Sequence, residues 1–218
     1  MTASPSPSHP ETAGPAHERV YRALRNAILW GELAPGAPLT LRGLAVQHGV
    51  SMTPAREAVR RLSAEGALSV SASGRISAPE LSADRLEELA SIRALLEPEL
   101  AARALRRVHL ALIERLDSIN HRIDETIVKG DASGYVRTNL EFHRTLYLRA
   151  QSPAMLALTE SVWLQAGPTM CALYARRQRS DATANHRRIL AALRAGDEPG
   201  LRAAMRADVT QGLRMLTG

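Results

Sequence analysis

Residues 44–62 carry the strongest structural signal in this chain of 218 residues, and they read Leu-Ala-Val-Gln-His-Gly-Val-Ser-Met-Thr-Pro-Ala-Arg-Glu-Ala-Val-Arg-Arg-Leu. Gly49 ends a first run of helical apolar spacing, and Ser51 is a favoured residue type for capping a second helix. The second helix has an inward stripe of Ala55, Ala58, Val59 and Leu62, and it presents Thr53, Arg56 and Arg60 outward. A short helix with a cationic outer face suits the major groove of DNA, so we interpret the stretch as a helix-turn-helix.

Two further motifs flank this stretch. Residues 28–36 read Ile-Leu-Trp-Gly-Glu-Leu-Ala-Pro-Gly, and residues 62–66 read Leu-Ser-Ala-Glu-Gly. With them, residues 23–68 resemble the winged helix-turn-helix of the GntR family of bacterial transcription regulators. The resemblance implies that operator DNA is contacted by Arg42, Ser51, Met52, Thr53, Arg56 and Gly74. Met52 departs from the family pattern, in which an Arg is usual, and its apolar side chain could meet a thymine methyl group.

A β-wing is predicted at residues 68–79, after the second helix. Apolar residues alternate on both sides of a Ser-Gly turn, which is typical of a two-stranded hairpin. The tip of such a wing lies over the DNA backbone or the minor groove, so Gly74 and Arg75 are expected to touch phosphate.

Positive charge is concentrated in the same part of the chain. Residues 17–79 hold eight Arg and four Glu, and the whole protein has a net charge of +6. This excess indicates a surface for an anionic partner such as double-stranded DNA, although a basic face that is merely solvated explains the composition equally well.

The opening segment, residues 1–16, is rich in Pro, Ser and Thr without apolar periodicity, which predicts a disordered leader. It lacks the charged and apolar regions of a signal peptide, and no later run approaches the roughly 20 apolar residues of a membrane-spanning helix. Cys171 is the only cysteine, so no internal disulfide can form. A cytoplasmic protein without a membrane partner is therefore expected.

Every segment beyond Pro79 has helical periodicity. Six amphipathic helices are predicted, at about 86–100, 112–127, 135–151, 153–178, 181–195 and 198–216. Asp181 and Asp197 are suited to cap the last two, and Gly167-Pro168 should kink the fourth. Because the connections are short, an antiparallel helical bundle is expected.

Three motifs in this region carry a second resemblance. They are Ile-Arg-Ala-Leu-Leu-Glu-Pro-Glu-Leu-Ala-Ala-Arg-Ala at 92–104, Asn-Leu-Glu-Phe-His-Arg-Thr-Leu at 139–146, and Asn-His-Arg-Arg-Ile-Leu-Ala-Ala-Leu-Arg-Ala-Gly-Asp at 185–197. They resemble the FCD effector domain of the FadR-type branch of the GntR family. The resemblance implies a mainly α protein: a leader at 1–16, a winged helix-turn-helix domain with a small β-wing at 17–79, and an all-helical effector-binding and dimerisation domain at 80–218 that forms a homodimer.

Many FCD domains hold a divalent metal with one Asp and three His, of which the Asp and the first His lie four residues apart on one helix. The matching positions here are Asn139, His143, His186 and Asp208. Asn139 stands where the family has its Asp, and Asp208 stands where the family has its last His. This exchange keeps one carboxylate and two imidazoles, a ligand set suited to zinc, nickel, iron or manganese, with Asn139 as a weak fourth ligand. The alternative is that the pocket has lost its metal and binds its effector by hydrogen bonds alone.

Arg93 matches the position at which FCD proteins aim a guanidinium into the effector cavity. A planar guanidinium suits a carboxylate, so the resemblance implies a small carboxylate effector. A simpler interpretation pairs Arg93 with Glu97, four residues further along the same helix.

Taken together, these features predict a DNA-binding transcription regulator, a repressor whose operator binding responds to a small organic acid held in the helical domain. One alternative is a metal-dependent enzyme built on the two-His, one-carboxylate set, but no nucleophile or general-base motif accompanies those ligands. Another is a nonspecific DNA-packaging protein, which would need no effector cavity. The chain is therefore predicted not to be an enzyme.

Overall fold

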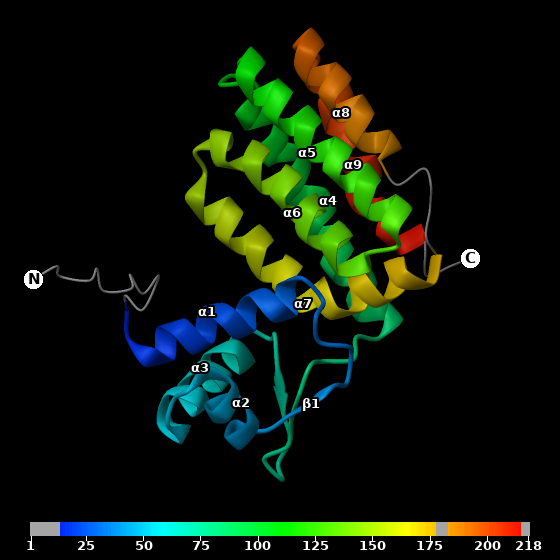
Figure 1. Ribbon diagram of the computed structural model, residues 1–218. Coiled ribbons are helices and arrows are strands. Elements are labelled where there is room, and N and C mark those ends of the chain that lie inside the picture. The colour runs from blue at the N-terminus through cyan, green and yellow to red at the C-terminus, as the bar shows by residue number, and fades with distance from the viewer. Residues whose placement is uncertain (1–13, 178–182, 215–218) are drawn as a thin grey trace, which may run out of the picture.

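The computed structural model describes residues 14–177 and 183–214, which form a winged helix beneath a helical bundle (Figure 1). The winged helix consists of α1 (Ala16–Leu29), β1 (Pro38–Leu39), α2 (Leu41–His48), α3 (Met52–Ala64), β2 (Ser69–Val70) and β3 (Ile76–Ser77). Most of the predicted leader lies outside the described residues. Its last residue, Ala16, already belongs to α1.

The helix-turn-helix forms where the sequence predicts it. Gly49 ends α2 in the left-handed conformation (φ 61°), which a glycine adopts without steric cost. Thr40 caps α2 by accepting a hydrogen bond from the Gly43 amide at 3.0 Å. Ser51 takes the capping position of α3, but its side chain makes no capping hydrogen bond. The predicted inward stripe of α3 is buried, and the predicted outward residues Thr53, Arg56 and Arg60 are exposed.

The wing has one strand more than the two predicted. β3 is central and pairs antiparallel with both β2 and β1. The added strand, β1, is two residues long and therefore shows no alternation that a sequence pattern could reveal. The predicted turn is present: the Ser71 amide donates to the Arg75 carbonyl at 2.9 Å, and Gly74 has φ 80°.

The helical bundle contains the six predicted helices. They are α4 (Ala83–Leu105), α5 (Leu110–Lys129), α6 (Ala132–Tyr147), α7 (Pro153–Arg177), α8 (Ala184–Ala195) and α9 (Glu198–Arg214), with a short 3₁₀ turn, η1 (Leu148–Ala150), after α6. Asp197 caps α9 by accepting from the Gly200 amide at 3.0 Å, as predicted. The predicted cap at Asp181 and the outer ends of three predicted helices lie outside the described residues.

Helix α7 belongs to both parts of the molecule. Its first part descends along one side of the bundle and its later part passes beneath the bundle, and α1 packs against this helix (Figure 1). Trp163 contributes to the core of the bundle, whereas its neighbour Leu164 lies in the core of the winged helix. The two parts are therefore joined by a shared helix as well as by the chain between β3 and α4.

Within the described ranges, none of the helices is both apolar and long enough to traverse a lipid bilayer.

Candidate functional site

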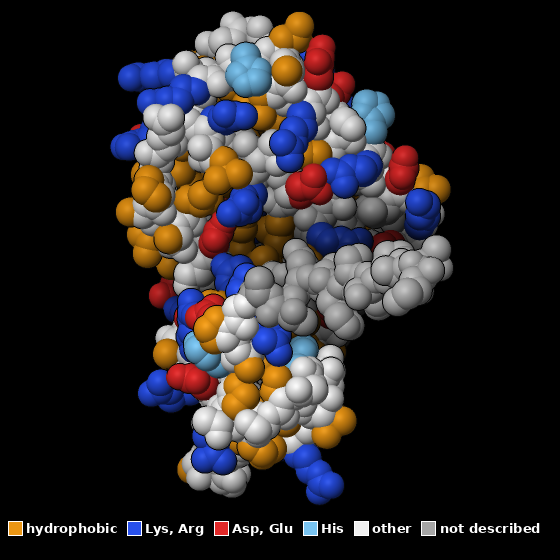
Figure 2. All heavy atoms as spheres, turned by 60° about the vertical axis from the view of Figure 1, so that its left-hand side comes forward, with side chains coloured by type: hydrophobic (Ala, Val, Ile, Leu, Met, Phe, Trp, Pro, Cys, Tyr) orange, Lys and Arg blue, Asp and Glu red, His pale blue; other side chains and the backbone are white. Residues whose placement is uncertain are grey.

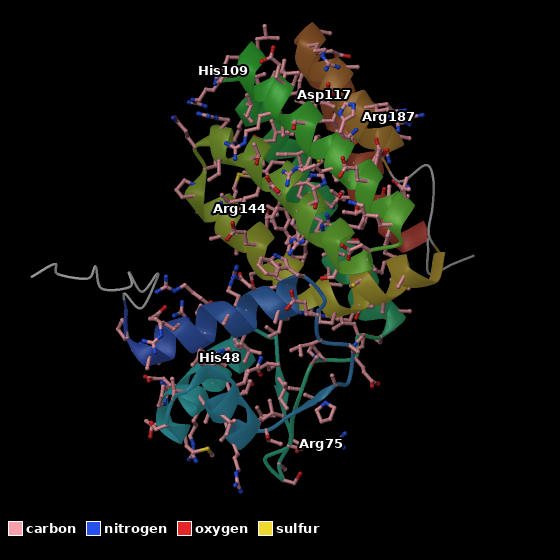
Figure 3. The ribbon with its side chains drawn as sticks, in the orientation of Figure 1. His48, Arg75, His109, Asp117, Arg144 and Arg187 are labelled. Atoms are coloured by element: carbon pink, nitrogen blue, oxygen red, sulfur yellow. The ribbon has the colours of Figure 1, made fainter. Side chains whose placement is uncertain are left out.

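The residues expected to touch DNA all lie on the surface of the winged helix. Arg42, Ser51, Met52, Thr53, Arg56, Gly74 and Arg75 are exposed. In the described part of the chain, the side chains of Arg42, Arg56 and Arg75 form no ion pair or hydrogen bond. Arg75 lies beside the wing, at the end of the molecule opposite His109 (Figure 3). Figure 2 shows basic side chains on the winged helix and on the bundle alike. Charge alone therefore does not identify the DNA-binding surface, and the exposed side of α3 and the wing is the better guide.

Two charged neighbours on α3 have other partners. Glu57, which follows Arg56 in the chain, lies with its carboxylate 3.8 Å from His17 on α1. Arg61 donates to Glu18 on α1 at 2.8 Å, and its guanidinium stacks 3.7 Å from the centre of the Tyr21 ring. These contacts hold α3 against α1.

In the helical bundle, His143 of α6, His186 of α8 and Asp208 of α9 come together. The Nε2 atom of His143 is 3.1 Å from Asp208 Oδ2, and the Nε2 atom of His186 is 3.5 Å from Asp208 Oδ1. Both imidazoles are fully buried. Three of the four predicted ligands are thus adjacent, although they are separated by up to 65 residues in the chain.

The orientation of His143 is set by a chain of hydrogen bonds behind it. The Tyr147 hydroxyl donates to Glu97 Oε2 at 2.8 Å, and its oxygen lies 3.2 Å from His143 Nδ1. Burial, reinforced by Glu97, raises the pKa of Tyr147 well above its usual range, so the hydroxyl keeps its proton. The Tyr147 oxygen then accepts the Nδ1 proton of His143, and Nε2 presents its lone pair to Asp208.

His186 is oriented in a similar way. Its Nδ1 lies 3.1 Å from Asn120 Oδ1, a carbonyl oxygen that can only accept a proton. The ring of Phe142 stacks on the imidazole at a centroid distance of 4.2 Å. Burial lowers the pKa of His186 to about 4, although Asp208 acts in the opposite direction. His186 is therefore neutral at pH 7, with the lone pair of Nε2 toward Asp208.

This arrangement fits a cation. Burial by itself would raise the pKa of Asp208, but the positive charge that His186 and His143 carry when they are protonated in acid, together with the Arg93 guanidinium, outweighs burial and lowers that pKa, so the group is a carboxylate. Among the described residues, neither buried Nε2 atom has a hydrogen-bond partner. Two lone pairs facing a carboxylate repel one another unless a positive charge lies between them. Ligands about 2.0 to 2.2 Å from a metal stand roughly 3 to 3.5 Å apart, which matches the two measured separations.

A cavity of about 70 Å³ adjoins this cluster on the side of Asp208. Arg93, Asn139 and Gln211 contribute its other polar walls, and the remaining walls are apolar or aromatic. Asn139 therefore shares the cavity with Asp208, one turn before His143 on α6. Both interpretations of Arg93 hold in part: its side chain lines the cavity, while its Nε donates to Glu97 Oε1 at 2.6 Å.

Sequence reasoning missed most of the residues that support the cluster. Glu97, fully buried, also accepts from Trp163 Nε1 at 3.0 Å, and so receives three donors. The Tyr147 and Asn120 contacts were not predicted either. A buried tyrosine four residues after a candidate ligand histidine, on the same helical face, was the one available signal.

A winged helix with an exposed outer face on its recognition helix, joined to a helical bundle that holds a mostly apolar cavity beside a buried polar cluster, defines a transcription regulator that has separate DNA-binding and sensing parts. Family models agree with this division: residues 16–76 match the bacterial regulatory proteins of the gntR family, and residues 88–211 match the FCD domain. The chain belongs to the GntR family, and its helical bundle is an FCD domain.

Individual relatives agree with this assignment. The HTH-type transcriptional regulator McbR of Escherichia coli (strain K12) is 30% identical over 201 residues, which span 91% of each chain. The solved structure of E. coli McbR/YncC superimposes with a TM-score of 0.86 at 29% identity, covering 94% of this chain and 98% of that one. A protein of Paenarthrobacter nicotinovorans named "Probable D-xylose utilization operon transcriptional repressor" is 29% identical, covering 78% of this chain and 75% of its own. These relatives are transcription regulators rather than enzymes, and nothing in them supports the enzyme alternative.

Proposed function

We propose that this GntR-family regulator is a repressor that binds a two-fold operator as a homodimer, and that a small organic acid in the FCD cavity modulates this binding. The observation that carries the proposal is the pair of buried, unpartnered Nε2 atoms facing Asp208 beside a cavity lined by Arg93. The division into a DNA-binding domain at 17–79 and an effector domain at 80–218 belongs to the same proposal.

The DNA-binding face consists of the exposed outer side of α3 and the wing. Arg56 is suited to base edges in the major groove, and Arg42 and Arg75 are suited to phosphates. One winged helix reads one half-site, so a homodimer places two of them on a two-fold operator. The effector then acts by favouring one arrangement of the two copies over another.

His143, His186 and Asp208 would hold a divalent cation, with Asn139 as a weaker fourth group. When bound, the cation supplies positive charge that can accept a carboxylate at the cavity wall. The chain's own residues do the rest. Tyr147 and Asn120 fix the imidazole tautomers, and Arg93 offers a guanidinium whose terminal nitrogens form no hydrogen bond in the described part of the structure. A cavity of this size, mostly apolar, suits a small acid with one carboxylate.

Metal content tests the site. Protein purified without chelator should contain close to one metal ion per chain by elemental analysis, and His143→Ala, His186→Ala or Asp208→Ala should lose it. Asn139→Ala should matter less, because an amide carbonyl is the weakest ligand of the four. The double variant Asn139→Asp with Asp208→His rebuilds the family pattern and should bind zinc or nickel more tightly than the wild type.

A wild-type protein that stays free of metal after soaking, while the double variant binds strongly, would mean that the exchange has disabled the site. The effector would then be held by Arg93 and hydrogen bonds alone. A thermal-shift screen of organic acids, with and without added zinc, addresses the effector directly, because a ligand of the folded state raises the melting temperature.

A further inference from the structure

The FCD cavity is not enclosed by the FCD domain alone. Leu29, the last residue of α1 in the DNA-binding part, lines it together with Ala166, Gly167 and Met170 of α7. The half-buried Leu29 side chain also packs against the cores of both parts of the molecule. A molecule in the cavity would therefore touch the winged helix directly.

The end of α1 is seated closely on the bundle. A Cβ atom at Gly167 would lie 2.5 Å from the Ile28 carbonyl oxygen, and one at Gly31 would lie 2.2 Å from Cys171 Cβ. On the other side, Ser133 at the start of α6 donates to the Trp30 carbonyl at 3.1 Å. Because the end of α1 is closely packed on both sides, a ligand that displaces Leu29 must move α1 as a whole.

Helix α1 in turn holds the recognition helix. Tyr21 on α1 donates to Glu65, just after α3, at 2.8 Å, and Glu18 accepts from Arg61. Movement of α1 therefore moves α3. No intervening linker has to transmit the change.

We propose that Leu29 is an effector-contacting residue supplied by the DNA-binding domain, and that an occupied cavity reorients α3 by pressing on the end of α1. The inference rests on the proposed function in one respect, namely that the cavity receives an effector. It assigns the coupling to a direct contact between the ligand and α1.

Filling the cavity by mutation tests the coupling without a ligand. In the full-length protein, Ala166→Phe places a ring against Leu29, and Ala157→Phe places the same ring on the exposed side of the same helix. Affinity is measured for a duplex that the wild type selects from a random pool, at one fixed salt concentration. Ala166→Phe should change operator affinity at least tenfold. The affinity should fall if the protein is a repressor that leaves its operator when the ligand binds. Ala157→Phe should stay within twofold of wild type.

A double-mutant cycle then identifies the contact. If the introduced ring acts by displacing Leu29, adding Leu29→Ala to Ala166→Phe should return operator affinity to within about threefold of the Leu29→Ala single variant. Leu33→Ala, which trims a leucine of the winged helix that does not line the cavity, should give no such recovery. Additive effects of Ala166→Phe and Leu29→Ala, or an Ala166→Phe affinity within twofold of wild type, would overturn the inference.

Circular dichroism establishes first that each variant is folded. If Ala166→Phe is not, Leu29→Trp fills the same cavity from α1 and must produce the same tenfold change, with Leu33→Trp as its control. Calorimetry of the wild type with zinc and then acetate, propionate or butyrate separates the two proposals. If the double-mutant cycle shows coupling but none of these acids binds, the proposed effector chemistry alone is rejected. If an acid binds but the effects of Ala166→Phe and Leu29→Ala are additive, the coupling alone is rejected.

Discussion

The hydroxyl of Tyr147 supports the cluster of His143, His186 and Asp208, because its oxygen accepts the Nδ1 proton and so fixes the tautomer of His143. Tyr147→Phe should therefore weaken zinc binding about 10- to 100-fold, the usual effect of removing a hydrogen-bond partner behind a ligand histidine. The measurement is competition for zinc against a chromophoric chelator. Tyr135→Phe is the matched control, since Tyr135 lines the cavity but has no hydrogen bond to His143. Equal zinc affinity in Tyr147→Phe and wild type would show that the hydroxyl does not orient the ligand.

On the face proposed to bind DNA, Arg56 is exposed on the outer side of α3, together with Thr53 and Arg60. Arg56→Ala should abolish specific operator binding with no change in folding, because the side chain has no packing role and a lost bidentate contact to a base costs about 1 to 3 kcal/mol. An electrophoretic mobility shift with the selected duplex measures this. Arg115→Ala, which removes an exposed cation from α5 of the bundle, should leave the shift intact. An unchanged shift with Arg56→Ala would place that side chain outside the interface.

At the level of elements, two glycines end helices with nearly the same backbone conformation in different surroundings. Gly49 after α2 has φ 61° and open space where a Cβ atom would lie, whereas Gly31 near the end of α1 has φ 67°, and a Cβ atom there would meet Cys171. Gly49→Ala should cost about 1 to 2 kcal/mol of unfolding free energy through its left-handed backbone alone. Gly31→Ala should cost about 1 to 3 kcal/mol more, because the added methyl group overpacks the seat of α1.

Urea denaturation of both variants makes the comparison. Equal losses of unfolding free energy in Gly49→Ala and Gly31→Ala would mean that α1 can shift on α7 at no cost in stability, contrary to the close packing described above. A larger loss in Gly31→Ala, accompanied by altered operator affinity, would connect the seat of α1 to the orientation of α3.

For the whole molecule, the shared helix α7 makes the stability of the winged helix depend on the bundle. Leu164 is 1% exposed and lies among the apolar side chains of α1 and α3, although it belongs to α7. Leu164→Ala should lower the unfolding free energy by about 2 to 5 kcal/mol and speed amide hydrogen exchange in α1 and α3. Leu158→Ala, on the same helix but 60% exposed, should stay within about 0.5 kcal/mol of wild type. Faster exchange confined to the bundle would show that the two cores are independent.

Local patterns in the sequence determined most of the elements. The helix-turn-helix and the six bundle helices follow from apolar spacing of about 3.6 residues and from breaks such as Gly49 and Gly196, because a helix closes its hydrogen bonds within one segment. The candidate ligands His143, His186 and Asp208 were implied by the family resemblance, and the structure brings them together. Strand β1 could not be predicted, because it lies outside the hairpin of β2 and β3 and exists only through its pairing with β3, which is distant in the sequence.

Only the tertiary structure decided what these elements do together. Besides Arg93 on its own helix, Glu97 gathers Tyr147 and Trp163 from two other helices, and these two contacts depend on packing between segments 50 or more residues apart. The same holds for Leu164 in the core of the winged helix and for Leu29 in the wall of the cavity. The sequence does not show which residues an apolar side chain will contact, because burial of apolar surface is non-directional and any close-packed neighbour satisfies it.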